Sequence, residues 1–443
     1  MRFFEFQGSY GPPRERVAVI GSGIAGLGTA WLLAPHHDVT LFEAEGRPGG
    51  HSRTREALGV SVDTGFIVCN PRTYRLFMPL MQHLGVQLKP TDMSFSASFG
   101  GGRYEFGTRT LPALFAQWRR AVDPGHLGLL SDALRFFRGA TDYANSDLTL
   151  GQMVDEMHLG RSFRDRFLLP ISGAIWSTPT RGMLDFPAAP FVRFFDNHGL
   201  LSVASHPQWY TVEGGARSYV ERLLSVTDAR VNLSDPVRRV LREAGGISLH
   251  SASGVHRFDR VVFACHAPQA LAMITDPTAA EREILGAFRT QPNRVVLHSD
   301  ANFMPRRRAA WSSWNYVTRG EAIPHDRPVS LSYWMNLLQG LKTPKPLIVT
   351  LNPEREPAQV HDDCWLSHPQ FDHAAITAQA RLPEIQGHGG LWFAGAWTRY
   401  GFHEDGLLSA LRVAQGMGLD WPLGPDPWVE QSAPAPQLLE AAE

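Results

Sequence analysis

The order of apolar and polar positions is clearest near the N-terminus of the chain. Residues 17–20 form a short, wholly apolar run, which is typical of a buried parallel strand. A glycine-rich turn follows, and then a helix of small and apolar residues that ends near Pro35. Residues 39–43 have the pattern of the next strand, so residues 15–54 predict a β-α-β unit.

Later segments keep a helical or a strand period over shorter stretches. Helices are predicted at residues 72–84, 112–138, 150–170, 216–226 and 406–417. Strands are predicted at residues 93–99, 237–242, 247–250, 260–264, 294–298, 328–334, 347–351 and 391–394. Residues 422–443 are rich in proline and alanine, which indicates a poorly ordered tail.

Composition narrows the class of protein. With 43% hydrophobic and 19% charged residues, the chain has the composition of a soluble globular protein, and its net charge of -1 argues against a nucleic-acid partner. Cys69, Cys265 and Cys364 lie far apart, which argues for a reducing compartment and against a zinc site. Because no secretory signal or membrane-spanning run is visible, we expect a cytoplasmic protein.

The turn after the first strand reads GSGIAG, residues 21–26, and has the spacing of a dinucleotide-binding turn. Gly21 permits the tight turn, Gly23 lets the backbone approach a pyrophosphate, and Gly26 allows the helix to pack closely on the strand. The phosphates would lie at the helix N-terminus, where free N–H groups and the dipole favour negative charge. Glu43, at the end of the second strand, can bind both ribose hydroxyls and would repel a 2'-phosphate, which disfavours NADP.

The segment after the second strand separates the NAD and FAD alternatives. Its sequence EAEGRPGGH, residues 43–51, resembles the ExxxRxGG segment of the FAD-dependent amine oxidase and phytoene desaturase superfamily. Residues 62–68, 210–223, 259–268 and 391–414 resemble further motifs of that superfamily, in the same order. The chain is therefore identified as a member, most similar to a bacterial branch associated with modification of membrane fatty acids.

The resemblance implies an α/β fold, in which a Rossmann-type FAD-binding domain of the glutathione-reductase type carries an inserted mixed α+β substrate domain. It assigns residues 14–70, 205–275 and 385–421 to the FAD-binding domain, and residues 71–204 and 276–384 to the substrate domain. The residues expected to bind FAD are Gly21, Ser22, Gly23, Ile24, Ala25, Gly26, Glu43, Ala44, Arg47, Gly49, Gly50, His51, Gly65, Phe66, Val237, Gly395, Ala396, Asp405, Gly406 and Leu407.

The chain departs from the superfamily pattern at several positions. Gly395-Ala396 stands where Gly-Glu is usual, and Asp405-Gly406 stands where Gly-Ala is usual. Asn293 lies nearest the position at which many amine oxidases have a lysine. Phe402 matches one wall of their aromatic cage but has no hydroxyl, so a simple primary-amine oxidase is disfavoured.

Removal of hydrogen across a carbon–carbon bond needs a hydride acceptor and a base. His403 is the preferred base, and a purely structural role for His403 and Glu404, in capping the last helix and holding its loop, stays open. The candidate catalytic residues are His403, Asn293, Glu404 and His51, and the residues expected to line the substrate are Phe402, Trp397 and Tyr400. His361, His368 and His373 lack the spacing of metal ligands, so we expect a surface loop and no metal.

We expect hydride transfer from a carbon of a hydrophobic or lipid substrate to FAD, with desaturation of a methylated fatty acyl chain of membrane lipid as the preferred reaction. An amine oxidase that releases hydrogen peroxide is one alternative, and a non-catalytic flavin-containing partner of a lipid-modifying enzyme is another. Arginines at 119, 120, 135, 138 and 306–308, near aromatic residues, suit a peripheral contact with the inner face of the membrane, although a solvated helix face explains them more simply. The sequence does not determine the oligomeric state.

Overall fold

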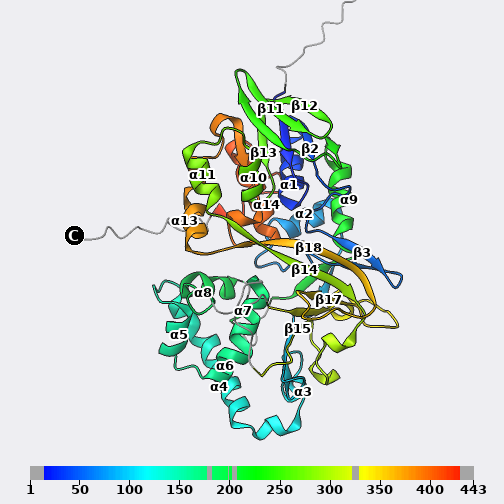
Figure 1. Cartoon of the computed structure of the whole chain (residues 1–443), viewed down its shortest axis with the longest axis vertical. Coiled ribbons are helices and arrows are strands. Elements are labelled where there is room, and N and C mark those ends of the chain that lie inside the picture. Colours follow the sequence, from blue (N-terminus) through cyan, green and yellow to red (C-terminus); the bar gives the residue numbers. More distant parts are fainter. Residues whose placement is uncertain (1–13, 177–181, 198, 202–206, 322–328, 430–443) are drawn as a thin grey trace, which may run out of the picture.

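A five-stranded parallel sheet forms the upper half of the molecule (Figure 1). The structure is a computed structural model and describes residues 14–176, 182–197, 199–201, 207–321 and 329–429. The strand order is β19-β13-β1-β2-β9. The strands are β1 (Arg16–Ile20), β2 (Asp38–Phe42), β9 (Ala229–Asn232), β13 (Arg260–Phe263) and β19 (Leu391–Phe393). Segments far apart in the sequence thus build one sheet, and the predicted α/β fold with a Rossmann-type sheet is confirmed.

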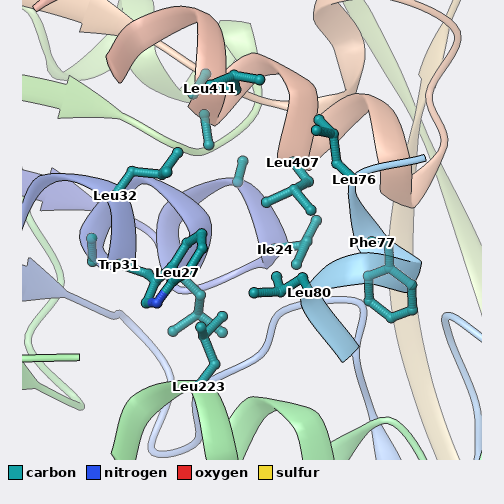
Figure 2. Close-up of a cluster of buried hydrophobic side chains, with 14 of the residues drawn as sticks. Ile24, Leu27, Trp31, Leu32, Leu76, Phe77, Leu80, Leu223, Leu407 and Leu411 are labelled. Carbon is teal, nitrogen blue, oxygen red and sulfur yellow. The ribbon is translucent and has the colours of Figure 1, made fainter. Parts of the chain in front are cut away.

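One face of this sheet is covered by helices that meet in an apolar cluster (Figure 2). The helices are α1 (Ile24–Leu33), α2 (Phe77–Leu84), α9 (Arg217–Val226) and α14 (His403–Gly416). Helices α1 and α14 approach closely because they meet at glycines. A Cβ atom on Gly28 would lie 2.7 Å from Leu407 Cδ1, and one on Gly406 would lie 2.7 Å from Ile24 Cγ2. This contact holds the start of α14 beside the start of α1.

A second apolar cluster covers the other face of the sheet. Its helices are α10 (Ala267–Met273), α11 (Ala279–Gly286) and α13 (His373–Arg381). An antiparallel sheet of β10 (Arg239–Glu243), β11 (Gly246–Ser251) and β12 (Gly254–Phe258) lies beside them.

The lower half contains a seven-stranded mixed sheet in the order β18-β14-β17-β16-β15-β6-β7. Its strands are β6 (Phe95–Phe99), β7 (Tyr104–Gly107), β14 (Arg289–His298), β15 (Trp314–Val317), β16 (Leu331–Trp334), β17 (Ile348–Leu351) and β18 (Val360–Gln370). The long strands β14 and β18 run between the two halves (Figure 1). Two smaller sheets pair β3 (Thr54–Ala57) with β4 (Val60–Asp63), and β5 (Leu88–Thr91) with β8 (Trp209–Val212).

The helices of the lower half enclose a core rich in phenylalanine. They are α4 (Pro124–Gly139), α5 (Leu150–Glu156), α6 (Arg161–Phe163), α7 (Leu169–Trp176) and α8 (Ala188–Asn197). The short helix α3 (Leu111–Leu114) follows β7, and α12 (Met335–Leu338) follows β16. The long helix predicted at residues 112–138 is interrupted, because Asp123 caps a new helix that begins at Pro124. The helix predicted at residues 150–170 is interrupted at Gly160, the N-cap of α6.

Two other expectations from the sequence are wrong, and one helix was not predicted. Residues 360–370 form strand β18 rather than a surface loop, and residues 188–197 form helix α8, which the sequence pattern did not predict. The first part of the predicted tail is packed, since Trp428 is only 6% exposed and lies in the cluster with α1 and α14. Residues 430–443 lie outside the described residues. None of the helices in the described part of the chain has the length and apolar character needed to span a bilayer.

Candidate active site

The N-terminus of α1 offers unpaired backbone N–H groups. Gly21 makes the turn with a φ of +104°, and its N–H donates to Phe42 O at 2.8 Å. No side chain caps the helix at Gly23, and its first turn, which the structure describes in full, contains no acidic residue. A Cβ atom on Gly23 would meet nothing within 4 Å. The turn therefore presents a positive helix end to open space, as an anionic pyrophosphate requires.

The predicted pair Gly49 and Gly50 lies directly against this turn. Gly49 N donates to Ser22 O at 3.0 Å, and a Cβ atom on Gly50 would lie 3.1 Å from Gly23 Cα. Arg47 Nη1 donates to Gly50 O at 3.1 Å, and burial lowers the pKa of Arg47. A guanidinium group thus lies beside the glycine turn, where it suits the charge of a pyrophosphate.

Glu43 directly follows β2 and is half-buried. Its Oε2 accepts a hydrogen bond from Ser22 N at 2.9 Å, and its Oε1 accepts one from Glu45 N at 2.9 Å. A carboxylate has further lone pairs, so these bonds leave acceptor capacity for ribose hydroxyls. Ala44 is exposed beside it, and Val237 lies in the loop after β9 against the apolar cluster that contains Phe42.

The segment after β4 is pressed against His51. Phe66 N donates to His51 O at 2.8 Å, and a Cβ atom on Gly65 would collide with the same carbonyl oxygen. The Phe66 ring then stacks on His403, with centroids 3.8 Å apart and planes inclined by 10°. Three predicted site residues, His51, Phe66 and His403, are thereby brought together at the start of α14.

His403 is held on several sides. Its Nε2 shares a hydrogen bond of 2.7 Å with the Tyr219 hydroxyl, which also bonds the Ser52 hydroxyl. Its ring packs edge-on against Phe77. Burial, followed by the charge of nearby His51, lowers the pKa of His403 to about 3, so its imidazole is neutral. Nothing in the sequence pattern pointed to Tyr219.

Three further histidines form a half-buried cluster with neutral rings. The ring centroid of His51 lies 6.2 Å from that of His266 and 5.6 Å from that of His368. Burial lowers the pKa of each to about 4. His51 Nε2 is buried and has no hydrogen-bond partner in the part of the chain that the structure describes. An unsatisfied buried nitrogen of this kind calls for a polar partner.

Asn293 joins this cluster from strand β14. Its side-chain nitrogen lies 2.9 Å from His368 Nδ1, and its side-chain oxygen accepts from Asn352 Nδ2 at 2.7 Å. His368 therefore lies on β18 beside the site, which corrects its interpretation as a surface-loop residue. Among the described residues, no group of three or more His, Cys, Asp or Glu side chains is arranged to hold a metal ion.

The carboxylates at the start of α14 are engaged with the protein itself. Glu404 accepts from Leu76 N at 2.7 Å, Phe77 N at 3.0 Å and Trp428 Nε1 at 2.9 Å. Burial nevertheless raises the pKa of Glu404 to about 7. The sequence placed Glu404 among the catalytic candidates, whereas its contacts are those of a capping residue for α2. Asp405 accepts from Phe402 N at 2.9 Å, and burial raises its pKa to about 6.

The residues expected to line the substrate separate into two groups. Phe402 stacks on Phe194 of α8, with centroids 5.0 Å apart, and it lines a cleft together with Tyr400. Trp397 does not line that cleft, which corrects the prediction that it lines the substrate. It is only 2% exposed, its Nε1 donates to Cys265 O at 2.9 Å, and its ring packs on Phe288.

The strand that precedes the α14 loop is held by backbone contacts. Gly395 N donates to Ser409 Oγ of α14 at 2.8 Å, and Ala396 O accepts from Gly401 N at 3.0 Å. Gly406 and Leu407 pack against α1, so their backbone groups lie near the glycine turn. The segment thus links the end of β19 to the N-terminus of α14.

A parallel Rossmann-type sheet, a glycine turn that fits a pyrophosphate and a second helix N-terminus beside it define an FAD-dependent oxidoreductase. The family model described as flavin containing amine oxidoreductase matches residues 24–322, so the chain belongs to that family. FAD is the cofactor of this family.

Relatives within the family differ in the reactions that their names give. The chain is 27% identical over 330 residues to a protein of Mycobacterium tuberculosis provisionally named flavin-containing monoamine oxidase AofH, with coverage of 72% of this chain and 70% of the relative. It is 26% identical over 348 residues to a hydroxyneurosporene desaturase of Cereibacter sphaeroides, with coverage of 70% and 64%.

A solved structure supports the fold alone. The crystal structure of a fatty acid isomerase from P. acnes superposes with a TM-score of 0.67 at 17% identity and covers 90% of this chain and 98% of that protein. The relatives therefore show a flavin oxidoreductase, and the substrate has to be inferred from the site.

Proposed function

We propose that this protein takes a hydride from a carbon of a hydrophobic substrate and thereby desaturates an acyl chain, such as the methylated fatty acyl chain of a membrane lipid. The observation that carries the proposal is that Phe402, Phe194, Asn293 and His368 are apolar or neutral groups. Phe402 extends the phenylalanine core through Phe194, and Asn293 presents an amide bonded to a neutral histidine. When bound, FAD supplies the two-electron acceptor for the hydride.

The second carbon–hydrogen bond releases a proton, for which we propose His51 as the acceptor. A general base needs a neutral nitrogen within reach of the substrate. His51 Nε2 is neutral and without a partner in the described residues, whereas His403 Nε2 is bonded to Tyr219. Burial keeps the pKa of His51 at about 4, so the acceptor is ready at neutral pH. In this proposal His403 positions Phe66 and the loop before α14.

The direct test is an anaerobic single turnover. Purified protein with bound FAD is mixed with acyl lipids, and the absorbance of oxidised flavin and the mass of the lipid are followed. We expect bleaching of the flavin and a product lighter by two hydrogen atoms, without any added electron acceptor. Comparison of lipids from cells with and without the gene identifies which acyl chain is changed.

Other outcomes of the same assay favour the alternatives. Flavin that is bleached by a polyamine or an aromatic amine but by no acyl lipid, with hydrogen peroxide on admission of air, would show an amine oxidase. The name of the Mycobacterium relative supports including these substrates. Tightly bound flavin that no substrate reduces would show a non-catalytic partner protein.

We also propose a peripheral contact with an anionic membrane through α3 and the 3-10 turn Trp118–Val122. Leu111 is 71% exposed, Trp118 is 84% exposed and Val122 is 75% exposed, although all three are apolar. Arg103 and Arg119 are exposed next to this apolar group. Arg119 directly follows Trp118, and its Nη2 donates to Arg103 O at 3.1 Å. Large apolar side chains flanked by cationic groups suit the interface of an anionic bilayer.

Vesicle co-sedimentation tests this contact. We expect the protein to sediment with vesicles of phosphatidylglycerol, and the variant Trp118→Ser to remain in solution. Trp365, which is 66% exposed on β18, provides a matched control, and Trp365→Ser is expected to sediment normally. Equal sedimentation of both variants would contradict the proposal.

A further inference from the structure

A small cleft lies beside the start of α14 and is lined by three arginines. Its volume is about 120 Å³, and Arg72, Arg75 and Arg399 contribute to its wall. Tyr400, Phe402 and Trp428 line it as well. A cleft of this size holds a small polar group and the first atoms of a chain attached to it, but not a whole lipid.

The arginines come from two distant segments that Glu404 brings together. The Glu404 carboxylate accepts hydrogen bonds from the backbone N–H groups of Leu76 and Phe77, which directly follow Arg75. Glu404 itself lies five residues after Arg399 in the chain. It also bonds Trp428 Nε1. The guanidinium carbon of Arg75 lies 5.0 Å from the Trp428 ring centroid, and that of Arg399 lies 4.5 Å from it. The indole of Trp428 thus contacts both Arg75 and Arg399 through cation–π interactions.

Glu404 and Asp405 also line the cleft, so three arginines and two carboxyl groups face it. Arg72 pairs with Asp196 at 3.1 Å, and Arg399 is 3.8 Å from Asp405, a longer separation. Arg75 donates to the carbonyl oxygens of Arg72 and Pro427, and in the described part of the chain it forms no ion pair with a carboxylate. A guanidinium group without a carboxylate partner, such as that of Arg75, favours an added oxyanion.

We propose that this cleft binds the oxyanion head of an acyl substrate. The proposal rests on the proposed function, because a head held here places the attached chain at Phe402, which leads through Phe194 to the apolar core of the lower half. The shared chemistry is a carboxylate or phosphate on a long alkyl chain, found in a free fatty acid and in a phospholipid. A cationic amine would meet like charges at the same place.

The test is equilibrium binding of ligands that share a chain and differ in their head. Hexadecanoate, hexadecanol and hexadecylamine are titrated into the FAD-bound protein by calorimetry. We expect hexadecanoate to bind more tightly than the other two. In Arg72→Gln its affinity should fall about tenfold, the effect of losing one hydrogen bond to a charged group, while hexadecanol is unaffected.

Two further variants distinguish a loss of binding from a loss of folding. Asn197 lines the cleft at the end of α8, and Asn197→Asp adds a negative charge without removing any guanidinium contact. This variant should lower the affinity for hexadecanoate and leave the affinity for hexadecanol unchanged. Arg239 is exposed on β10, far from the cleft in sequence, so Arg239→Gln makes the same charge change as a control and should bind hexadecanoate normally.

Vesicles of phosphatidylglycerol distinguish the two sources of the oxyanion. If dispersed hexadecanoate binds and the vesicles do not compete with it, the ligand is a free fatty acid. If the vesicles compete with hexadecanoate and Arg72→Gln abolishes that competition, the ligand is a phospholipid. Equal affinity for the three heads, or no effect of Arg72→Gln and Asn197→Asp, would overturn the cleft proposal even if acyl lipids reduce the flavin. Arginine-dependent binding without flavin reduction would uphold the cleft and overturn the acyl desaturation.

Discussion

The phosphate-facing end of the site and its substrate-facing end are built from different kinds of contact. At the first end, Gly21, Gly23 and Gly49 bring backbone segments together, and few side chains take part. At the second end, side chains from distant elements meet in pairs: Tyr219 bonds His403, Phe66 stacks on His403, and Asn293 bonds His368. The geometry of the glycine turn therefore depends on where a Cβ atom is tolerated, whereas the geometry around His403 depends on packing between distant elements.

The largest expected effect comes from a substitution in the glycine turn at residues 21–26. In Gly26→Ala the new Cβ atom would collide with the Gly21 carbonyl oxygen, and the backbone cannot move away without opening the turn. We expect a loss of more than about 3 kcal/mol in the free energy of unfolding, together with loss of FAD. Urea unfolding and the flavin content of the purified protein measure the two effects.

Gly23→Ala is the matched control for that change. Its Cβ atom would meet nothing within 4 Å, so folding of the protein without FAD should be close to normal. FAD affinity should still fall, because the added methyl group occupies the open space at the helix N-terminus. A Gly26→Ala protein as stable as Gly23→Ala would contradict this account of the turn.

The next effect concerns Glu404, the carboxylate at the start of α14 that caps α2. Glu404→Ala removes the acceptor of three N–H groups, those of Leu76, Phe77 and Trp428. Leaving buried donors unsatisfied is expected to cost about 2 to 3 kcal/mol of unfolding free energy. Thermal or urea unfolding measures it, and an Ala variant of unchanged stability would show that the cap is unimportant.

Glu404 also makes a pH-dependent contribution to stability. Its pKa is about 7 in the folded protein against 4.5 for an ordinary glutamate, so between these values the folded state binds more protons than the unfolded state. The stability contributed by Glu404 is therefore full below about pH 4.5 and is lost as the pH rises towards 7. Urea unfolding across this range should show a slope that is shallower in Glu404→Gln, by at most about 1.4 kcal/mol per pH unit.

Equal slopes in the two proteins would show that Glu404 is ionised at all these pH values. Asp405 and Asp63, whose pKa values are each raised to about 6 by burial, add a slope of the same sign and are present in both proteins. The comparison of Glu404→Gln with the unaltered chain therefore isolates the carboxyl group of residue 404.

Two histidine variants sharpen the assignment of roles at the substrate end. His51→Gln is expected to lower the rate of flavin reduction at least about tenfold and to remove its acidic limb, because glutamine is not a base. His403→Gln keeps a group able to bond the Tyr219 hydroxyl, so its rate should fall less. Stopped-flow measurement of flavin bleaching across pH distinguishes them, and the reverse order would assign the proton to His403.

The smallest expected effect tests the removal of Trp397 from the site. Trp397→Phe loses the hydrogen bond to Cys265 O and keeps the packing on Phe288. We expect a loss of about 1 kcal/mol in stability and an unchanged rate of flavin reduction. A lower rate with unchanged stability would place Trp397 at the substrate after all.

The secondary structure was predictable where the apolar residues of a segment recur at a regular spacing and pack against the core. Strand β1 and helix α9 lie within a residue or two of their predicted limits. Strand β18 was missed because polar residues hide its pattern. Asp362 pairs with Arg53, and Asp363 pairs with Arg294. Partners so distant in sequence leave no local period to detect.

By itself, the sequence determined the cofactor end of this protein. The turn at residues 21–26, Glu43 and the pair Gly49 and Gly50 lie within one short β-α-β unit, where backbone geometry follows from local residue type. Only the tertiary structure decided the substrate end. Glu404 and Leu76 are 328 residues apart, and Tyr219 and His403 are 184 apart. Contacts over such separations depend on how whole helices and strands pack, and a local pattern does not contain that information.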